Sequence, residues 1–144
     1  MILPDVNILV CAHREDAPNH KAIRGWLEKE IGSGMPFGLS DQMLSGFIRV
    51  VTHPGIFNPP SPLKAALDFA GELRGHPNCV HINPGDRHWV IFRDLCSAAE
   101  TRGNHVPDAW FAALAMESGS EWITTDHDYG RFPKLKWRHP LGKG

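Results

Sequence analysis

The sequence lacks the features that assign a protein to a broad class at once. Charge of one sign is not in excess, because 15 Lys and Arg face 16 Asp and Glu for a net charge of −1. A strongly basic footprint, the usual mark of a nucleic-acid binder, is therefore absent, and only a local basic patch remains compatible with the composition. No apolar run approaches the roughly 20 residues that span a bilayer. Asp5 also interrupts the opening apolar residues before a secretory segment forms.

Cysteine is scarce as well. Cys11, Cys79 and Cys96 are an odd number at wide spacing, which is typical of a reducing cytosol rather than of a disulfide framework. We therefore expect a soluble, cytoplasmic protein without a membrane partner. Its 144 residues, 42% of them hydrophobic, predict one domain, 1–144, around one core.

Short apolar runs alternate with amphipathic stretches along the chain. The runs at residues 1–3, 35–40, 79–82 and 121–125 predict strands, and helical periodicity predicts helices over 6–14, 17–32, 41–54, 63–75, 89–103 and 108–119. Four prolines within residues 54–62 predict a stiff loop. Strands that alternate with helices indicate the α/β class with a largely parallel sheet.

Aspartates follow the first and the last of these strands. Asp5 comes directly after the first strand, and Asp126 and Asp128 come after the last. In open parallel sheets, ligands bind outside the carboxyl ends of the strands, so both sets should lie on the ligand side. Asp108 opens the alanine-rich helix 108–119, whose small residues let it lie close to the sheet. The sequence thus predicts four acids in one pocket.

A pocket of clustered carboxylates predicts a bound cation. Such groups repel and raise one another's pKa unless a cation fills the pocket or some stay protonated. Oxygen ligands suit a hard cation, Mg²⁺ or Mn²⁺. Mg²⁺ keeps waters that phosphate oxygens can displace, so hydrolysis of phosphate esters by a metal-activated water is the leading class of chemistry.

Each aspartate also has a purely structural explanation. Asp5 and Asp108 fit helix N-caps, and Asp126 with Asp128 fits an Asx turn that closes a loop. Convergence favours the functional interpretation, because three separate segments deliver aspartate, not Ser or Thr, to one predicted edge.

Three motifs together resemble a known family. The stretches "LPDVNIL", "FIRVVTHP" and "DAWFAALAMESGSEWITTDHDYGRF" resemble the PIN-domain ribonucleases, specifically the VapC-type toxins of bacterial toxin-antitoxin modules. The resemblance implies a three-layer α/β/α fold with a central, mostly parallel sheet and cleavage of RNA that depends on Mg²⁺ or Mn²⁺. It further implies a VapB-like antitoxin as partner and a homodimer.

The resemblance also implies roles for single residues. Asp5, Asp108 and Asp126 match the acids that hold the metal, and Asp128 matches an often acidic position in the same catalytic group. Asn7 and Thr125 match polar positions beside the pocket. We expect these two, together with Arg131, to contact substrate.

One position departs from the family pattern. Many members carry a glutamate three residues before the arginine of the "GFIRV" motif, where this chain has Gly46. Asp41, five residues earlier, is rotated by roughly 140° on a helix and does not simply replace it. Asp41 would reach the pocket only as a cap at the end of the preceding strand. We therefore predict one tightly held ion and a second that depends on bound substrate.

The C-terminal segment is basic, and two rival functions also fit the sequence. Arg131, Lys134, Lys136, Arg138 and Lys143 surround Trp137, as either a solvated surface or a contact for RNA backbone or an acidic antitoxin segment. Transfer of phosphate to an aspartate is one rival function, although the first strand offers only Asp5-Val6-Asn7. A non-catalytic remnant that still binds antitoxin or RNA is the other, motivated by Gly46.

Overall fold

Five parallel strands form one sheet at the centre of the molecule. The computed structural model describes residues 1–142, and its strands are β1 (Ile2–Pro4), β2 (Phe37–Leu39), β3 (Cys79–His81), β4 (Glu121–Ile123) and β5 (Trp137–Arg138). The strand order is β3-β2-β1-β4-β5, and every pair is parallel. The chain therefore builds outward from β1 to β3 and then crosses back to place β4 beside β1. This reversal of direction is a topological switch point, where open α/β sheets bind ligands.

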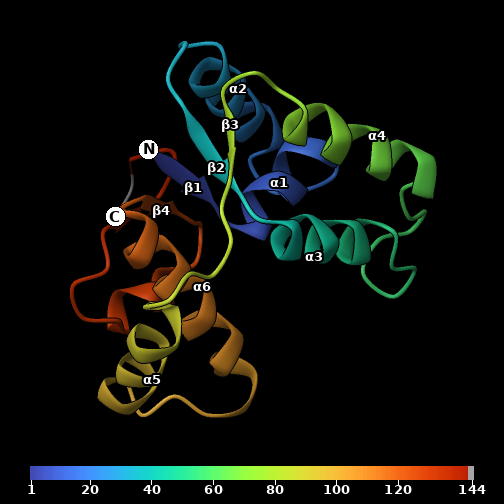
Figure 1. Ribbon diagram of the computed structural model, residues 1–144. Coiled ribbons are helices and arrows are strands. Elements are labelled where there is room, and N and C mark those ends of the chain that lie inside the picture. The colour runs from blue at the N-terminus through green and yellow to red at the C-terminus, as the bar shows by residue number, and fades with distance from the viewer. Residues whose placement is uncertain (143–144) are drawn as a thin grey trace.

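Helices cover the sheet in two groups. The connections that run from β1 to β3 carry α1 (Val6–His13), α2 (His20–Ile31), α3 (Asp41–Val51) and α4 (Leu63–Arg74). The return crossover carries α5 (His88–Ala98) and α6 (Val106–Ser118), with a short 3-10 turn, η1 (Gly103–His105), between them. Because parallel crossovers are right-handed, reversing direction places the second group on the other face. In Figure 1, α5 and α6 lie at the lower left, apart from α1, α3 and α4 on the right. The predicted α/β/α arrangement is confirmed.

Local sequence explains where the helices next to the sheet begin and how they pack. The Ser40 hydroxyl accepts a hydrogen bond from the Met43 N–H at 3.1 Å and so caps α3, as short polar side chains do at helix N-termini. α3 then buries Met43, Leu44, Phe47 and Val51 on one face. α6 buries four alanines, Ala109, Ala112, Ala113 and Ala115. These small side chains allow the close approach to the sheet that the sequence predicts.

Several helix boundaries differ from the sequence predictions, and one strand was not predicted. α5, for example, ends at Ala98 rather than at residue 103, and α3 ends at Val51 rather than at residue 54. α6 begins at Val106 rather than at Asp108, because Pro107 fits the first turn, where its missing N–H is not needed. β5 was not expected, since its two residues lie in a basic, proline-flanked tail without alternating hydrophobicity. It exists through backbone pairing, in which the Trp122 N–H donates to the Lys136 carbonyl at 2.9 Å. Lys143, predicted as part of the basic tail, lies outside the described residues.

None of the helices in residues 1–142 combines the length and the apolar character that a membrane crossing demands.

Gly38, in the middle of β2, gives a test of this packing. An added Cβ would lie 2.9 Å from Ile82 Cγ1 and 3.1 Å from Leu3 Cδ1, so Gly38→Ala should lower the free energy of unfolding by about 1–3 kcal/mol through overpacking. Gly25→Ala is the matched control, because nothing lies within 4 Å of its new methyl group and alanine favours helix by about 1 kcal/mol. Urea denaturation compares the two, and equal stability of both variants would refute the assigned packing of β2.

Candidate active site

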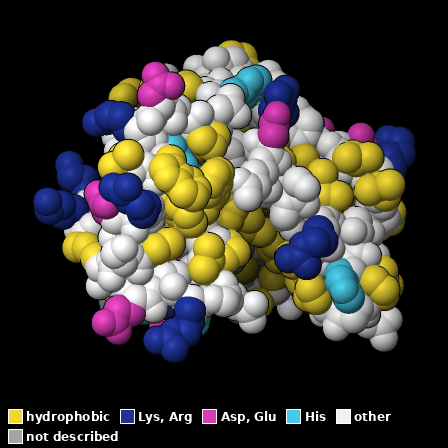
Figure 2. All heavy atoms as spheres, turned by 60° about the horizontal axis from the view of Figure 1, so that its bottom comes forward, with side chains coloured by type: hydrophobic (Ala, Val, Ile, Leu, Met, Phe, Trp, Pro, Cys, Tyr) yellow, Lys and Arg dark blue, Asp and Glu magenta, His cyan; other side chains and the backbone are white. Residues whose placement is uncertain are grey.

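A cleft of about 470 Å³ opens at the carboxyl ends of β1 and β4. Figure 2 faces this end of the molecule and shows a hollow between the α6 side on the left and the α3 side on the right. The cleft is lined by residues of four segments: Asp5, Val6, Asn7, Gln42, Ser45, Gly46, Arg49, Asp108, Phe111, Asp126 and Tyr129. Three of the four predicted catalytic aspartates, Asp5, Asp108 and Asp126, are among them.

Asp5 is the most buried carboxylate of the cleft, at 7% exposure. Its Oδ1 accepts the Val6 N–H at 2.6 Å, so it is also the N-cap of α1. Its Oδ2 accepts the Thr124 hydroxyl at 2.7 Å and the Asn7 amide at 3.2 Å. Asp5 therefore serves both as a helix cap and as a residue of the cleft, because each carboxylate oxygen can accept more than one hydrogen bond.

Burial dominates the protonation of Asp5. Loss of hydration raises its pKa from 3.8 to about 7, against the lowering effect of hydrogen bonds from Thr124 and from the Val6 N–H. The negative charges of Asp108 and Asp126 raise the pKa further. These three side chains thus interact electrostatically in one cleft, as expected of a site that favours a cation.

Asp108 lies in the first turn of α6 and is held by a cation and a phenol. Arg131 donates to Oδ2 at 3.0 Å, and the Tyr129 hydroxyl donates to Oδ1 at 3.3 Å. Burial, followed by the charges of Asp5 and Asp108, raises the pKa of Tyr129, so the phenol keeps the proton it donates. Arg131, predicted to contact substrate, is ion-paired with Asp108 and is not among the residues that line the cleft.

Asp126 and Asp128 occupy different surroundings. Asp126 caps the 3-10 turn η2 (His127–Arg131), where its Oδ1 accepts the Asp128 N–H at 2.9 Å. This is the predicted Asx turn, and its carboxylate also lines the cleft. The Asp128 side chain is exposed and is not part of the cleft lining. The structure therefore brings Asp126 to the other two acids and leaves Asp128 outside.

The α3 wall of the cleft carries no carboxylate among its lining residues. Its contributions are Gln42, Ser45, Gly46 and Arg49. Asp41 does not reach the cleft as a cap, because Ser40 takes the capping position and Asp41 pairs with Arg74 at 2.7 Å on the surface. Asp41 therefore does not supply the carboxylate that many family members carry at the position of Gly46.

Sequence reasoning missed Thr124 and Tyr129. The Thr124 hydroxyl is fully buried, donates to Asp5, and accepts the Asn7 amide at 3.1 Å and the Asp126 N–H at 3.0 Å. Thr125, the predicted neighbour of the pocket, contributes its backbone N–H to Asn7 Oδ1 at 3.3 Å. Strand parity was the available signal, because Thr124 and Trp122 are on the same side of β4 whereas Thr125 is on the other. Asn7 lies where it was expected, between the two loops.

The side chains of the cleft are not already arranged as a metal cage. Within residues 1–142, no group of three or more His, Cys, Asp or Glu side chains is close enough to hold an ion. Asp108 instead contacts Arg131 and Tyr129. The donor set is all oxygen, which is the type that Mg²⁺ and Mn²⁺ prefer. To bind an ion, Asp108 would have to give up part of its interaction with Arg131.

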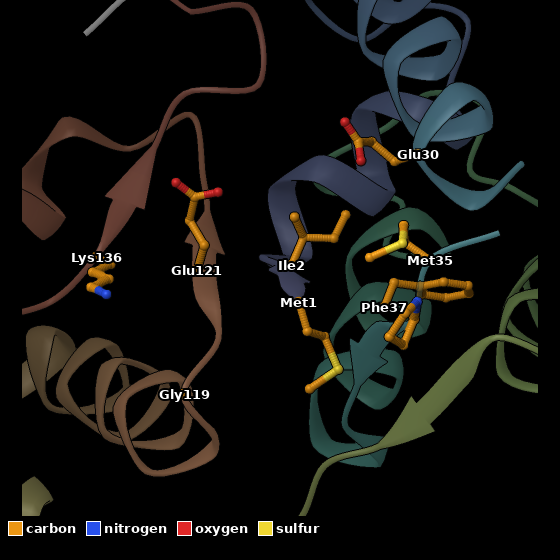
Figure 3. Close-up of a pocket in the computed structure, with 9 residues that line it drawn as sticks. Met1, Ile2, Glu30, Met35, Phe37, Gly119, Glu121 and Lys136 are labelled. Carbon is orange, nitrogen blue, oxygen red and sulfur yellow. The ribbon is translucent and has the colours of Figure 1, made fainter. Parts of the chain in front are cut away.

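A second cavity, of about 340 Å³, lies at the opposite edge of the sheet. Figure 3 shows it between Glu121 and Lys136 on one side and Met1, Ile2 and Phe37 on the other. These residues precede or begin their strands, so the cavity is at the amino ends. It shares no lining residue with the carboxylate cleft and is separate from the candidate site.

Comparison with known proteins agrees with this geometry. Residues 2–135 match the PIN domain family. Ribonuclease VapC43 of Mycobacterium tuberculosis is 42% identical over 141 residues, which are 98% of this chain and 96% of the relative. Ribonuclease VapC25 of the same organism is 35% identical over 97% of this chain and 99% of the relative. Among solved structures, a chain of VapBC2 from Rickettsia felis, bound to a DNA fragment from their promoter, superposes with a TM-score of 0.71 at 16% identity. This match covers 96% of this chain and 98% of that one.

The strand order and the cleft define the class as an α/β domain with acids at the switch point of a parallel sheet. This chain belongs to the PIN domain family and, within it, to the VapC ribonucleases. The structural neighbour, at 16% identity, supports the fold alone.

Thr124 gives a stability test of the site. Thr124→Val keeps the shape but removes the donor to Asp5 and the acceptor for Asn7 and Asp126, so we expect a loss of about 1–3 kcal/mol in the free energy of unfolding. Thr125→Val should stay within about 0.5 kcal/mol of the parent, since its backbone contact remains. Urea denaturation measures both, and a larger loss at Thr125 than at Thr124 would contradict the assigned network.

The raised pKa of Asp5 predicts how stability depends on pH in the presence of a chelator. A carboxyl whose folded pKa is about 7 contributes stability that is complete below pH 3.8 and disappears as pH rises through 7. From pH 5 to pH 8 the parent should therefore lose on the order of 2 kcal/mol relative to Asp5→Asn, which has no proton to release. Asp128→Asn, at an exposed carboxylate, is the control and should follow the parent. Parallel curves for the parent and Asp5→Asn would show that Asp5 is ionised throughout.

Proposed function

We propose that this chain is an endoribonuclease that depends on Mg²⁺ or Mn²⁺ and acts as the toxin of a toxin-antitoxin system. The observation that carries the proposal is the meeting of Asp5, Asp108 and Asp126 in one cleft at the switch point of the sheet. The relatives named VapC ribonucleases, which match almost the whole chain, support the same activity.

Asp5, Asp108 and Asp126 are the residues that would hold the metal ion. All three offer carboxylate oxygens, which are the ligands that these ions prefer. The charges of Asp108 and Asp126 raise the pKa of Asp5, and a bound cation would offset this repulsion. When bound, Mg²⁺ or Mn²⁺ acidifies a water for attack on phosphorus and offsets charge on the phosphate oxygens. Asp128, which lies outside the cleft, would act only through the η2 turn that positions Asp126.

The chain itself supplies orientation. Thr124 and Asn7 fix Oδ2 of Asp5, and the Val6 N–H fixes Oδ1, so this carboxylate is held before any ligand arrives. Tyr129 remains a donor to Asp108, because burial and neighbouring acids disfavour its ionisation. Preorganised groups of this kind lower the barrier, since they need not reorganise during the reaction.

Arg131 has a proposed role in the exchange between ion and substrate. In the structure it neutralises Asp108 at 3.0 Å. If Asp108 held an ion, this pair would be weakened, and the Arg131 guanidinium would then be available for an RNA phosphate, to which arginine donates paired hydrogen bonds. Asn7, which lines the cleft, and Thr125, whose N–H donates to Asn7, complete the proposed substrate contacts.

We further propose a VapB-like antitoxin as partner, a homodimer, one domain that spans residues 1–144, and action in the cytoplasm. The fold similarity to VapBC2 and to FitAB bound to IR36 DNA fragment supports the antitoxin. A growth-arrest assay of the chain expressed alone, and then beside the product of its neighbouring gene, identifies the partner.

The activity is tested on a panel of end-labelled folded RNAs, transfer RNAs and ribosomal stem-loops, with Mg²⁺ or with chelator. Asp5→Asn, Asp108→Asn and Asp126→Asn should each reduce cleavage on the order of 100-fold or more, because several kcal/mol of charge stabilisation are lost. Asp128→Asn should have a smaller effect. Asp94→Asn, at an exposed carboxylate of α5, is the matched control and should cleave like the parent.

Calorimetry with Mn²⁺ separates the enzyme from a non-catalytic remnant. The parent should bind one ion per chain, and Asp5→Asn should bind it at least about tenfold more weakly. A parent that neither binds Mn²⁺ nor cleaves any RNA of the panel would leave the binding module as the better assignment. Full activity of Asp5→Asn and Asp108→Asn would refute the metal site.

A further inference from the structure

One face of α3 forms the wall of the cleft opposite the carboxylates. Gln42, Ser45, Gly46 and Arg49 recur at helical spacing and all line the cleft, because residues three and four apart share a face. The opposite face is buried in the core through Met43, Phe47 and Val51. The core therefore fixes the rotation of α3, and the orientation of the cleft wall follows from it.

Arg49 is the one cation among the described residues that line this cleft. Arg14, Arg24, Arg74, Arg131 and Arg138 each form an ion pair with a carboxylate at 3.0 Å or less. In residues 1–142, Arg49 has no such pair, although three carboxylates line the same cleft. Arg49 and the three carboxylates line the same cleft without forming an ion pair. The space between them suits an anionic group that binds a cation on one side and the guanidinium on the other.

Gly46 contributes no side chain to this wall of the cleft. A Cβ at position 46 would lie 3.3 Å from Val6 Cγ2, a contact tighter than side chains normally make. α3 thus packs closely against Val6 in the first turn of α1, next to Asp5, and a side chain at position 46 would require Val6 to shift by a few tenths of an ångström. With glycine at this position, the charge that this wall contributes to the cleft is the positive one of Arg49.

We infer that Arg49 binds the phosphate that is cleaved and neutralises the charge that a second metal ion would otherwise neutralise. This inference rests on the proposed nuclease function. A guanidinium matches two phosphate oxygens with parallel hydrogen bonds. Gln42 and Ser45, which lie two turns and one turn before Arg49, offer further donors to the same anion. The site then consists of one ion held by aspartates on one side and one arginine on the other.

The test uses single-turnover cleavage, with enzyme in excess over an end-labelled RNA that the parent cleaves. Arg49→Ala should lower the rate constant by about 10²–10³, as removal of a donor to developing charge does. Arg49→Lys, which keeps the charge but loses the paired hydrogen bonds, should recover about tenfold of that loss. Millimolar guanidinium should raise the rate of Arg49→Ala and leave the parent unchanged.

Two further measurements distinguish this role from a structural one or from metal binding. Calorimetry should give one Mn²⁺ per chain for both the parent and Arg49→Ala, with affinities within about threefold, since Arg49 is not a ligand. Arg93→Ala removes an exposed arginine of α5 and should cleave within about twofold of the parent. Equal thermal melting of parent and Arg49→Ala verifies folding.

Several outcomes would overturn the inference. An Arg49→Ala variant that cleaves within about threefold of the parent, or that only weakens RNA binding with an unchanged rate constant, would place Arg49 away from the scissile phosphate. Two Mn²⁺ ions per parent chain would remove the need for it. A parent that shows no metal-dependent cleavage would instead refute the proposed function itself, so the two failures are distinguishable.

Discussion

The hydrogen bond from the Thr124 hydroxyl to Asp5 is the contact on which the site depends. It spans 2.7 Å between residues 119 positions apart, and it joins the loops that follow β1 and β4. Asn7 and the Asp126 N–H also donate to the same hydroxyl oxygen. One buried threonine thus fixes a helix cap, a polar neighbour and the start of an acidic turn relative to one another. The rest of the cleft is arranged around this fixed point.

Structural and chemical roles coincide in two of the three acids. Asp5 caps α1 and Asp126 caps η2, and both carboxylates also line the cleft. A cap holds its carboxylate through one oxygen, which reduces the entropy lost when the other oxygen binds a ligand. Asp108 is different, because it is held by side chains, Arg131 and Tyr129, that can release it. The site therefore combines two fixed acids with one adjustable acid.

The sequence predicted the parts of the fold that local patterns encode. Helical periodicity identified six helices close to their observed bounds, and short apolar runs identified β1 to β4. β5 was missed because its two residues carry no periodic signal and form through pairing with β4. Asp5, Asp108 and Asp126 were expected at one edge because parallel strands end there. Strand parity would have favoured Thr124 over Thr125, whereas the exposure of Asp128 depends on rotations within one loop that residue order alone does not determine. The pairing of Asp41 with Arg74 depends on how α4 docks, which is a tertiary property.

The strand order has a consequence for biosynthesis. β1, the first strand to leave the ribosome, lies at the centre of the sheet and pairs with β4, so that Ile2 meets Glu121. Contacts between residues this distant along the chain form late. During synthesis a domain folds as a unit, so β1 can pair with β4 only after β4 has emerged from the ribosome. The three acids therefore cannot assemble until nearly the whole polypeptide has been translated. A growing chain, or one that terminates before β4, carries no complete cleft, and a cell that makes such a nuclease is exposed to it only after synthesis is essentially finished.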